Sequence, residues 1–80
     1  MDEGQIREKL KIYLGSRRAG LSDDTELFET GALDSMGMLD LIAFIEETFG
    51  VAFGPNELKL ENFRSVRVIA ARVRAGLAGR

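Results

Sequence analysis

The 80-residue sequence contains no histidine and no cysteine. Without imidazole there is no Ser-His nucleophile pair and no ordinary general base near neutral pH. Without a thiol there is no disulfide, no thiolate nucleophile and no zinc site of the Cys/His type. A Ser-Lys pair is disfavoured too, because Lys9, Lys11 and Lys59 are the only lysines and each lies in a polar stretch. The composition therefore argues against a catalyst that relies on its own side chains.

Long apolar segments are also missing. No uncharged apolar run is long enough to span a membrane, and the first residues contain acids and lack the apolar core of a signal peptide. A hydrophobic fraction of 45% and a charged fraction of 30% are typical of a globular protein. A chain of this length can build one small core. We expect a single domain spanning residues 1–80, cytoplasmic and without membrane insertion.

Alternating strand patterns are absent, whereas helical spacing is present. A first helix is predicted from an apolar stripe with spacing i, i+4, i+7 and i+8, and Gly15 or Gly20 can end it. A second helix is predicted from Ser35 or Met36 to Phe49, before Gly50. Ser65 can cap a last helix. The apolar stripes of the first and last helices are Ile6, Leu10, Tyr13 and Leu14, and Val66, Ile69, Ala70, Val73 and Leu77.

The segments between these helices predict one long and one short connection. Residues 16–33 have no sustained helical period and read as a loop, which Leu27, Phe28 and Leu33 would attach to the core. After Gly54 and Pro55, residues 56–60 could form a short helix. The predicted fold is all-α, a small bundle of three main helices plus one short helix, or four helices in all, with a long loop between the first two.

Charge is unevenly distributed along the chain. Residues 21–63 contain ten carboxylates and only one cation, Lys59, whereas the residues from Arg64 onward contain arginines and no acid. We expect these opposite charges to attract one another within the fold. The acidic centre opposes nucleic-acid binding. The acids of the long loop do not have the spacing of a calcium-binding loop, and solvation explains them more simply: Asp23, Asp24, Glu26 and Glu29.

The stretch GALDSMGMLDL, residues 31–41, places Ser35 at the predicted start of the second helix. Such a serine can be a helix cap, a nucleophile or an attachment point, and the missing histidine excludes a conventional nucleophile. A capping box would have Glu or Gln three positions later, where Met38 stands. Asp34 is the better cap if the Ser35 oxygen is modified. A phosphodiester on that oxygen would lie in the favourable field of a helix N-terminus.

The predicted second helix has two faces. One face should enter the core, namely Met38, Leu41, Ile42, Ile45 and Phe49. The opposite face combines apolar residues with carboxylates: Met36, Leu39, Ala43 and Phe44 with Asp40, Glu46 and Glu47. A contiguous exposed apolar strip often marks a docking surface, although a loop could instead cover these residues.

Together these features resemble the acyl and peptidyl carrier proteins, which are modified with 4′-phosphopantetheine. The resemblance covers nearly the whole chain: the helix order, the long loop with Leu27-Phe28, the triplet Asp34-Ser35-Met36 and the turn at Pro55. The run Gly31-Ala32-Leu33-Asp34-Ser35 has one residue more than the Gly-x-Asp-Ser of fatty-acid carriers and lacks the Gly-Gly-His-Ser of many peptidyl carriers. It is similar to D-alanyl carrier proteins and some free-standing biosynthetic carriers, so the cargo class stays open.

The resemblance implies a free-standing, monomeric carrier that tethers acyl or aminoacyl groups as thioesters on a phosphopantetheine arm at Ser35. It also implies partners: a phosphopantetheinyl transferase, an acyl or aminoacyl ligase or synthase, and downstream transferases. Asp40, Glu46 and Glu47 match acidic positions that meet basic patches on such enzymes, with Met36, Leu39 and Phe44 as the apolar centre. The alternative is a non-catalytic helical interaction module in which Ser35 is only a cap.

Overall fold

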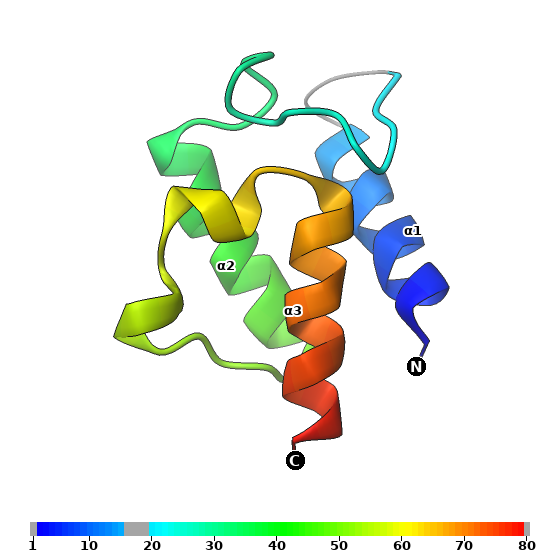
Figure 1. The fold of residues 1–80 in the computed structure, drawn as a ribbon, viewed down its shortest axis with the longest axis vertical. Helices are drawn as coiled ribbons and strands as arrows, with labels where there is room; N and C mark the ends of the chain where they lie inside the picture. Colours follow the sequence, from blue (N-terminus) through cyan, green and yellow to red (C-terminus); the bar gives the residue numbers. More distant parts are fainter. Residues whose placement is uncertain (1, 16–19, 80) are drawn as a thin grey trace.

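The computed structural model describes residues 2–15 and 20–79, which form an all-helical fold around one core. Helix α1 spans Glu3–Gly15, α2 spans Ser35–Phe49 and α3 spans Val66–Ala78. Two short 3₁₀ helices, η1 (Pro55–Glu57) and η2 (Leu60–Phe63), lie between α2 and α3. Within these described ranges there is no strand, as predicted. In Figure 1, α1 and α3 run in opposite directions, so the two ends of the chain lie at the same end of the bundle.

The helix boundaries follow from local capping. Helix α2 begins after Asp34 and ends at Gly50, whose φ of 70° is the left-handed conformation that glycine adopts without strain. Helix α3 begins after Ser65, whose hydroxyl oxygen accepts a hydrogen bond from Val68 N at 3.2 Å. These ends agree with the predicted start and stop of the second helix and with the predicted cap of the last helix.

The core takes one side of each helix and part of the long loop. Leu27 is fully buried although it lies in that loop, and its N–H donates to the carbonyl oxygen of Arg64 at 2.7 Å. Leu33 N in turn donates to Leu27 O at 2.9 Å, and Phe28 packs half-buried against the core. The predicted attachment of the loop is confirmed for its described part, while residues 16–19 lie outside the described residues. The core hydrophobics are Ile6, Leu10, Leu14, Leu27, Ala32, Leu33, Leu41, Ile45, Phe49, Val51, Phe63, Val66, Ile69, Ala70 and Val73.

The predicted short helix over residues 56–60 is wrong in its bounds. The chain instead forms η1 and η2, so the described residues contain three α-helices and not a bundle of four. Asn62 explains the break, because this buried side chain donates from Nδ2 to the carbonyl oxygen of Glu57 at 2.9 Å. Its Oδ1 accepts a hydrogen bond from Arg72 of α3, also at 2.9 Å. A backbone carbonyl that accepts this side-chain bond is held in a turn between two short helices.

Ion pairs connect the long loop to α1 and to α3. Asp23 lies 3.1 Å from Arg7 Nε and 3.0 Å from Lys11 Nζ, both on α1. Asp24 accepts two hydrogen bonds from the Arg67 guanidinium of α3, at 2.7 and 3.2 Å. These hydrogen bonds lower the pKa of Asp24 and raise the pKa of Arg67. The predicted internal attraction between acids and C-terminal arginines is confirmed at Arg67.

Candidate functional site

Ser35 is the first residue of α2 and its side chain is exposed. The helix cap is the preceding residue: Asp34 has an extended backbone, and its Oδ1 accepts a hydrogen bond from Gly37 N at 2.7 Å. Within the described part of the chain, no hydrogen-bond partner is found for the Ser35 hydroxyl. The interpretation of Ser35 as the cap is therefore wrong, and its oxygen points to solvent with no structural task.

The start of α2 presents a favourable field for an anion. The first amides of a helix have no partner within the helix, and here the Asp34 side chain and backbone oxygens satisfy Gly37 N and Met38 N. The amides of Ser35 and Met36 come earlier in the same turn, at the positive end of the helix dipole. A phosphate ester on Ser35 would lie beside them. Across residues 2–15 and 20–79, no group of acidic side chains could hold a metal ion.

The outward side of α2 forms a surface that we call the acidic face: Met36, Leu39, Asp40, Ala43, Glu46 and Glu47. All six residues are exposed, and the apolar members are large, since 74% of Met36 and 60% of Leu39 is accessible. No loop residue that the structure describes covers them. The expected exposed strip of apolar residues bordered by carboxylates is therefore present, next to Ser35.

Phe44 does not belong to the acidic face, although the sequence placed it there. It is half-buried, and its ring stacks on Tyr13 of α1 with centroids 4.3 Å apart and an interplanar angle of 21°. It also meets the edge of Phe49 at 6.3 Å. At about 100° of rotation per residue, Phe44 lies about a quarter of a turn from the centre of the acidic face, which directs it toward α1.

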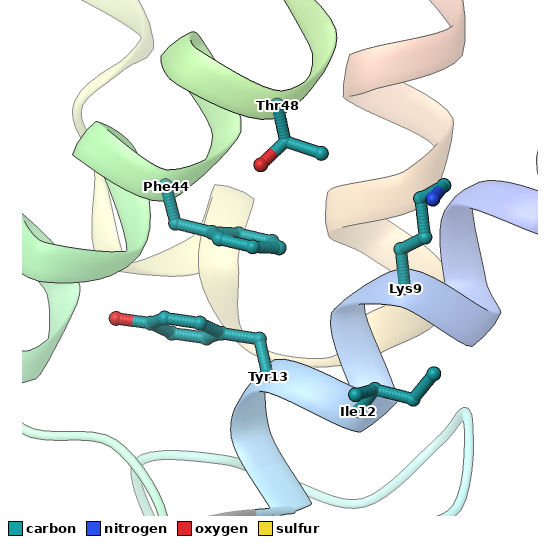
Figure 2. Close-up of a pocket in the computed structure, with 5 residues that line it drawn as sticks. All are labelled: Lys9, Ile12, Tyr13, Phe44 and Thr48. Carbon is teal, nitrogen blue, oxygen red and sulfur yellow. The ribbon is translucent and has the colours of Figure 1, made fainter.

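The Tyr13–Phe44 pair forms part of a groove between α1 and α2 (Figure 2). Its volume is about 410 Å³, and its lining consists of Lys9, Ile12, Tyr13, Phe44 and Thr48. This groove was not predicted from the sequence. Ile12 was the available signal, because it lies outside the buried stripe of α1 and is 70% exposed.

Two further exposed leucines were also missed. Leu58, between η1 and η2, is 44% exposed and Leu60, at the start of η2, is 57% exposed. Nothing in the periodicity distinguished them from core residues, because the segment has no regular helical spacing.

None of the helices in the described ranges combines the length and the apolar character that would be needed to cross a membrane.

Comparisons with known proteins agree with this geometry. A family model described as "Phosphopantetheine attachment site" matches residues 4–73. The chain is 41% identical over 69 residues to the D-alanyl carrier protein of Lactococcus lactis subsp. cremoris (strain MG1363), covering 86% of this chain and 87% of that protein. It is 33% identical over 61 residues to the probable acyl carrier protein PigG of Serratia sp. (strain ATCC 39006), covering 76% and 70%. A D-alanyl carrier protein of Abiotrophia defectiva is 34% identical over 55 residues, covering 69% and 70%.

Proposed function

The chain belongs to the family of carrier proteins with a phosphopantetheine attachment site, and from this premise we propose that Ser35 carries the arm. The cofactor of the family is 4′-phosphopantetheine, bound covalently. A carrier protein is not itself a catalyst, because other enzymes load, change and unload what it bears. When attached, the arm supplies the thiol that this cysteine-free sequence lacks.

The observation that supports Ser35 is the division of tasks at the start of α2. Asp34 Oδ1 holds Gly37 N at 2.7 Å and caps the helix, so modification of the neighbouring hydroxyl removes no contact of the fold. The exposed Ser35 oxygen can enter the active site of a modifying enzyme while the bundle stays folded. The anionic phosphodiester would then lie at the positive end of α2.

The cargo we propose is an acyl or aminoacyl group held as a thioester. The relatives include D-alanyl carrier proteins and a probable acyl carrier protein, so the two kinds of cargo are both represented among them. The proposed partners are a phosphopantetheinyl transferase, a ligase or synthase that loads the arm, and transferases that remove the product. In this proposal residues 1–80 are a single, free-standing, monomeric carrier domain that works in the cytoplasm.

We further propose that the acidic face docks these enzymes through basic patches. Of its carboxylates, Asp40 lies beside Met36 and Leu39, within two turns of Ser35. Glu46 and Glu47 continue the face about three turns from Ser35. Charge complementarity of this kind mainly raises the association rate and selects partners, which suits a carrier that must leave each enzyme after one step. Phe44 has an indirect role in this proposal, because its stacking on Tyr13 holds α2 against α1.

The attachment is tested by incubating the protein with coenzyme A and a broad-specificity phosphopantetheinyl transferase and measuring the intact mass. We expect the mass to rise by one arm in the wild type and in Ser22→Ala, which removes another exposed serine. Ser35→Ala should stay unmodified while remaining folded. No gain in folded wild type would instead favour a helical interaction module without a prosthetic group.

Docking is tested with the double variant Asp40→Lys/Glu47→Lys. We expect slower modification by the transferase at low salt, with unchanged helix content by circular dichroism, because the charge of the face is reversed without touching the core. Glu8→Lys is the matched control, since Glu8 is an exposed acid on α1 away from this face. Equal rates for all three proteins at low ionic strength would contradict docking through the acidic face.

A further inference from the structure

The groove between α1 and α2 is a second surface feature, distinct from the acidic face and from Ser35. Figure 2 shows the Tyr13 and Phe44 rings stacked against each other, with Thr48 from α2 and with Lys9 and Ile12 from α1 around the open space. The lining is mostly apolar, and Ile12 leaves 70% of its surface accessible at the rim. Ile12 and the aromatic pair together form one contiguous apolar surface, the kind of patch that can mark an interaction site.

The groove and the acidic face lie on different sides of α2. Phe44 and Thr48 are rotated by about 100° and about 140° from the centre of the acidic face, as the helical repeat requires. Ser35 lies nine residues before Phe44, which is about 13 Å along the axis at 1.5 Å per residue, and on the other side of the helix. A molecule seated in the groove therefore leaves Ser35 and Leu39 accessible, whereas Asp40 and Glu47 lie at the border between the groove and the acidic face.

The charge of the groove is opposite to that of the acidic face. Among the described residues of the lining, Lys9 is the one that carries a charge, and no carboxylate of residues 2–15 and 20–79 lies within ion-pair distance of its ammonium group. The other two cations of α1, Arg7 and Lys11, are both paired with Asp23. Lys9 is thus an available cation beside an apolar surface, and its complement is an apolar group next to a carboxylate.

The shape of the groove favours a protein segment over a free small molecule. Its volume of about 410 Å³ is at the lower end of the roughly 300–1,000 Å³ typical of small-molecule pockets. It is also open to solvent, whereas such pockets bury most of their ligand. A helix laid along the channel between α1 and α2 would cover the open side and insert one or two apolar side chains, as in helix-in-groove recognition.

We propose that this groove binds an amphipathic helix of a partner protein, with an apolar anchor on the Tyr13–Phe44 pair and Ile12 and an acidic residue paired with Lys9. Such a partner differs in charge from one that docks on the acidic face. Because the two surfaces do not overlap, one protein can hold the domain by the groove while another reaches Ser35. This inference does not depend on the identity of the arm or the cargo.

The probe is a blocked, alanine-based helical peptide with Leu and Phe one turn apart and two glutamates flanking them; a matched peptide has lysines in place of the glutamates. In a titration of the ¹⁵N-labelled protein followed by NMR, we expect saturable shifts at residues 9–13 and 44–48 with the acidic peptide. Binding of the lysine peptide should be weaker by about two- to fivefold, as the loss of one exposed ion pair predicts.

Variants separate the groove from general surface effects. Lys9→Glu should weaken binding of the acidic peptide by about two- to fivefold, because an exposed ion pair is lost. Ile12→Ser should weaken it by about fivefold or more, because apolar contact is lost. Lys59→Glu and Leu60→Ser, an exposed cation and an exposed leucine elsewhere, should change binding less than twofold. Circular dichroism should give all four proteins the helix content of the wild type, which shows that they are folded.

Several results would overturn the proposal. In the NMR titration, these are the absence of saturable shifts and shifts centred on Met36 and Leu39. In the affinity measurements, they are equal affinity of the protein for the two peptides and an equal loss of binding in Leu60→Ser and Ile12→Ser. Concentration-dependent shifts at the groove without peptide would also count against it, because they would show a second copy of the chain as the occupant. None of these results alters the mass test at Ser35, so the two proposals fail separately.

Discussion

At the residue scale, neighbouring side chains at the start of α2 have different tasks. Asp34 Oδ1 accepts the hydrogen bond from Gly37 N, while the Ser35 hydroxyl faces solvent. We expect Asp34→Ala to lower the free energy of unfolding by about 1 kcal/mol, the usual cost of losing a helix cap. Asp34→Asn should retain most of that stability, because an amide oxygen can still accept the bond.

The free energies of unfolding of these variants are measured by urea unfolding, and Ser35→Ala is measured in parallel as the comparison. Removing an exposed hydroxyl without a partner in the fold should change the free energy of unfolding by less than about 0.5 kcal/mol. A loss at Ser35 equal to the loss at Asp34 would mean that the serine caps the helix after all. The pair of measurements thus tests the local geometry without any cofactor present.

Sequence reasoning located the candidate site because its signals are local. The triplet Asp34-Ser35-Met36 sits at a helix start, and a helix start is readable from a cap residue and an apolar period. What it could not decide was which of Asp34 and Ser35 caps the helix, since both types are good caps. Phe44 was misplaced for another reason: its ring is drawn to Tyr13, thirty-one positions earlier, and a helical wheel contains no information about the neighbouring helix.

At the element scale, the long loop is held in place by ion pairs as well as by Leu27. Arg67 donates two hydrogen bonds to Asp24, and these lower the pKa of that carboxyl. We expect an NMR titration to give Asp24 a pKa below its usual value, and Arg67→Gln to return it toward that value. A midpoint unaffected by the substitution would show that the pair is not formed in solution.

The sign of the stability effect follows from this shift. A carboxyl whose folded-state pKa is lowered stabilises the fold above its unfolded-state pKa, and that contribution disappears as the pH falls through the folded-state pKa. The contribution of Asp24 is therefore complete at neutral pH and is lost only in acid. It is also small and sensitive to salt, because 71% of the Asp24 side chain and 55% of the Arg67 side chain are exposed.

The contact between α3 and the chain after α2 gives a second test at this scale. A Cβ added to Gly76 would lie 2.6 Å from Cγ1 of Val51, a buried and β-branched side chain with little freedom to move. Overpacking costs about 1–3 kcal/mol, whereas alanine gains about 1 kcal/mol over glycine within a helix. We expect Gly76→Ala to destabilise the protein in spite of its better helix propensity.

A double-mutant cycle, measured by urea unfolding, tests whether the clash with Val51 causes the loss of stability. In a Val51→Ala background the clash is removed, so Gly76→Ala should become neutral or stabilising. The same destabilisation in both backgrounds would show that Gly76 is required for a reason other than its approach to Val51.

The three helices were predictable and the segment between α2 and α3 was not, for a physical reason. Helices α1, α2 and α3 each bury a repeating apolar stripe, which appears in the sequence as a period. The bends of η1 and η2 depend on Asn62, whose side chain joins the Glu57 carbonyl to Arg72 of α3. A polar residue held by one local and one distant partner leaves no period, so the segment was predicted as one short helix.

At the scale of the whole molecule, the charges divide into an internal set and an outward set. The loop acids Asp23 and Asp24 are neutralised by cations of α1 and α3. The acids of α2 lie on the exposed acidic face around Met36 and Leu39. Part of the negative charge of the central segment is thus displayed on the helix that begins at Ser35, an arrangement that speeds encounter with a basic partner.

The measurement that tests the central claim most directly is peptide-level mass spectrometry of protein produced together with an active phosphopantetheinyl transferase. After proteolysis, the fragment containing Ser35 should carry one arm, and fragmentation should locate it on that side chain. An arm found on another residue, or folded protein that remains entirely unmodified, would contradict the assignment of Ser35 as the attachment point.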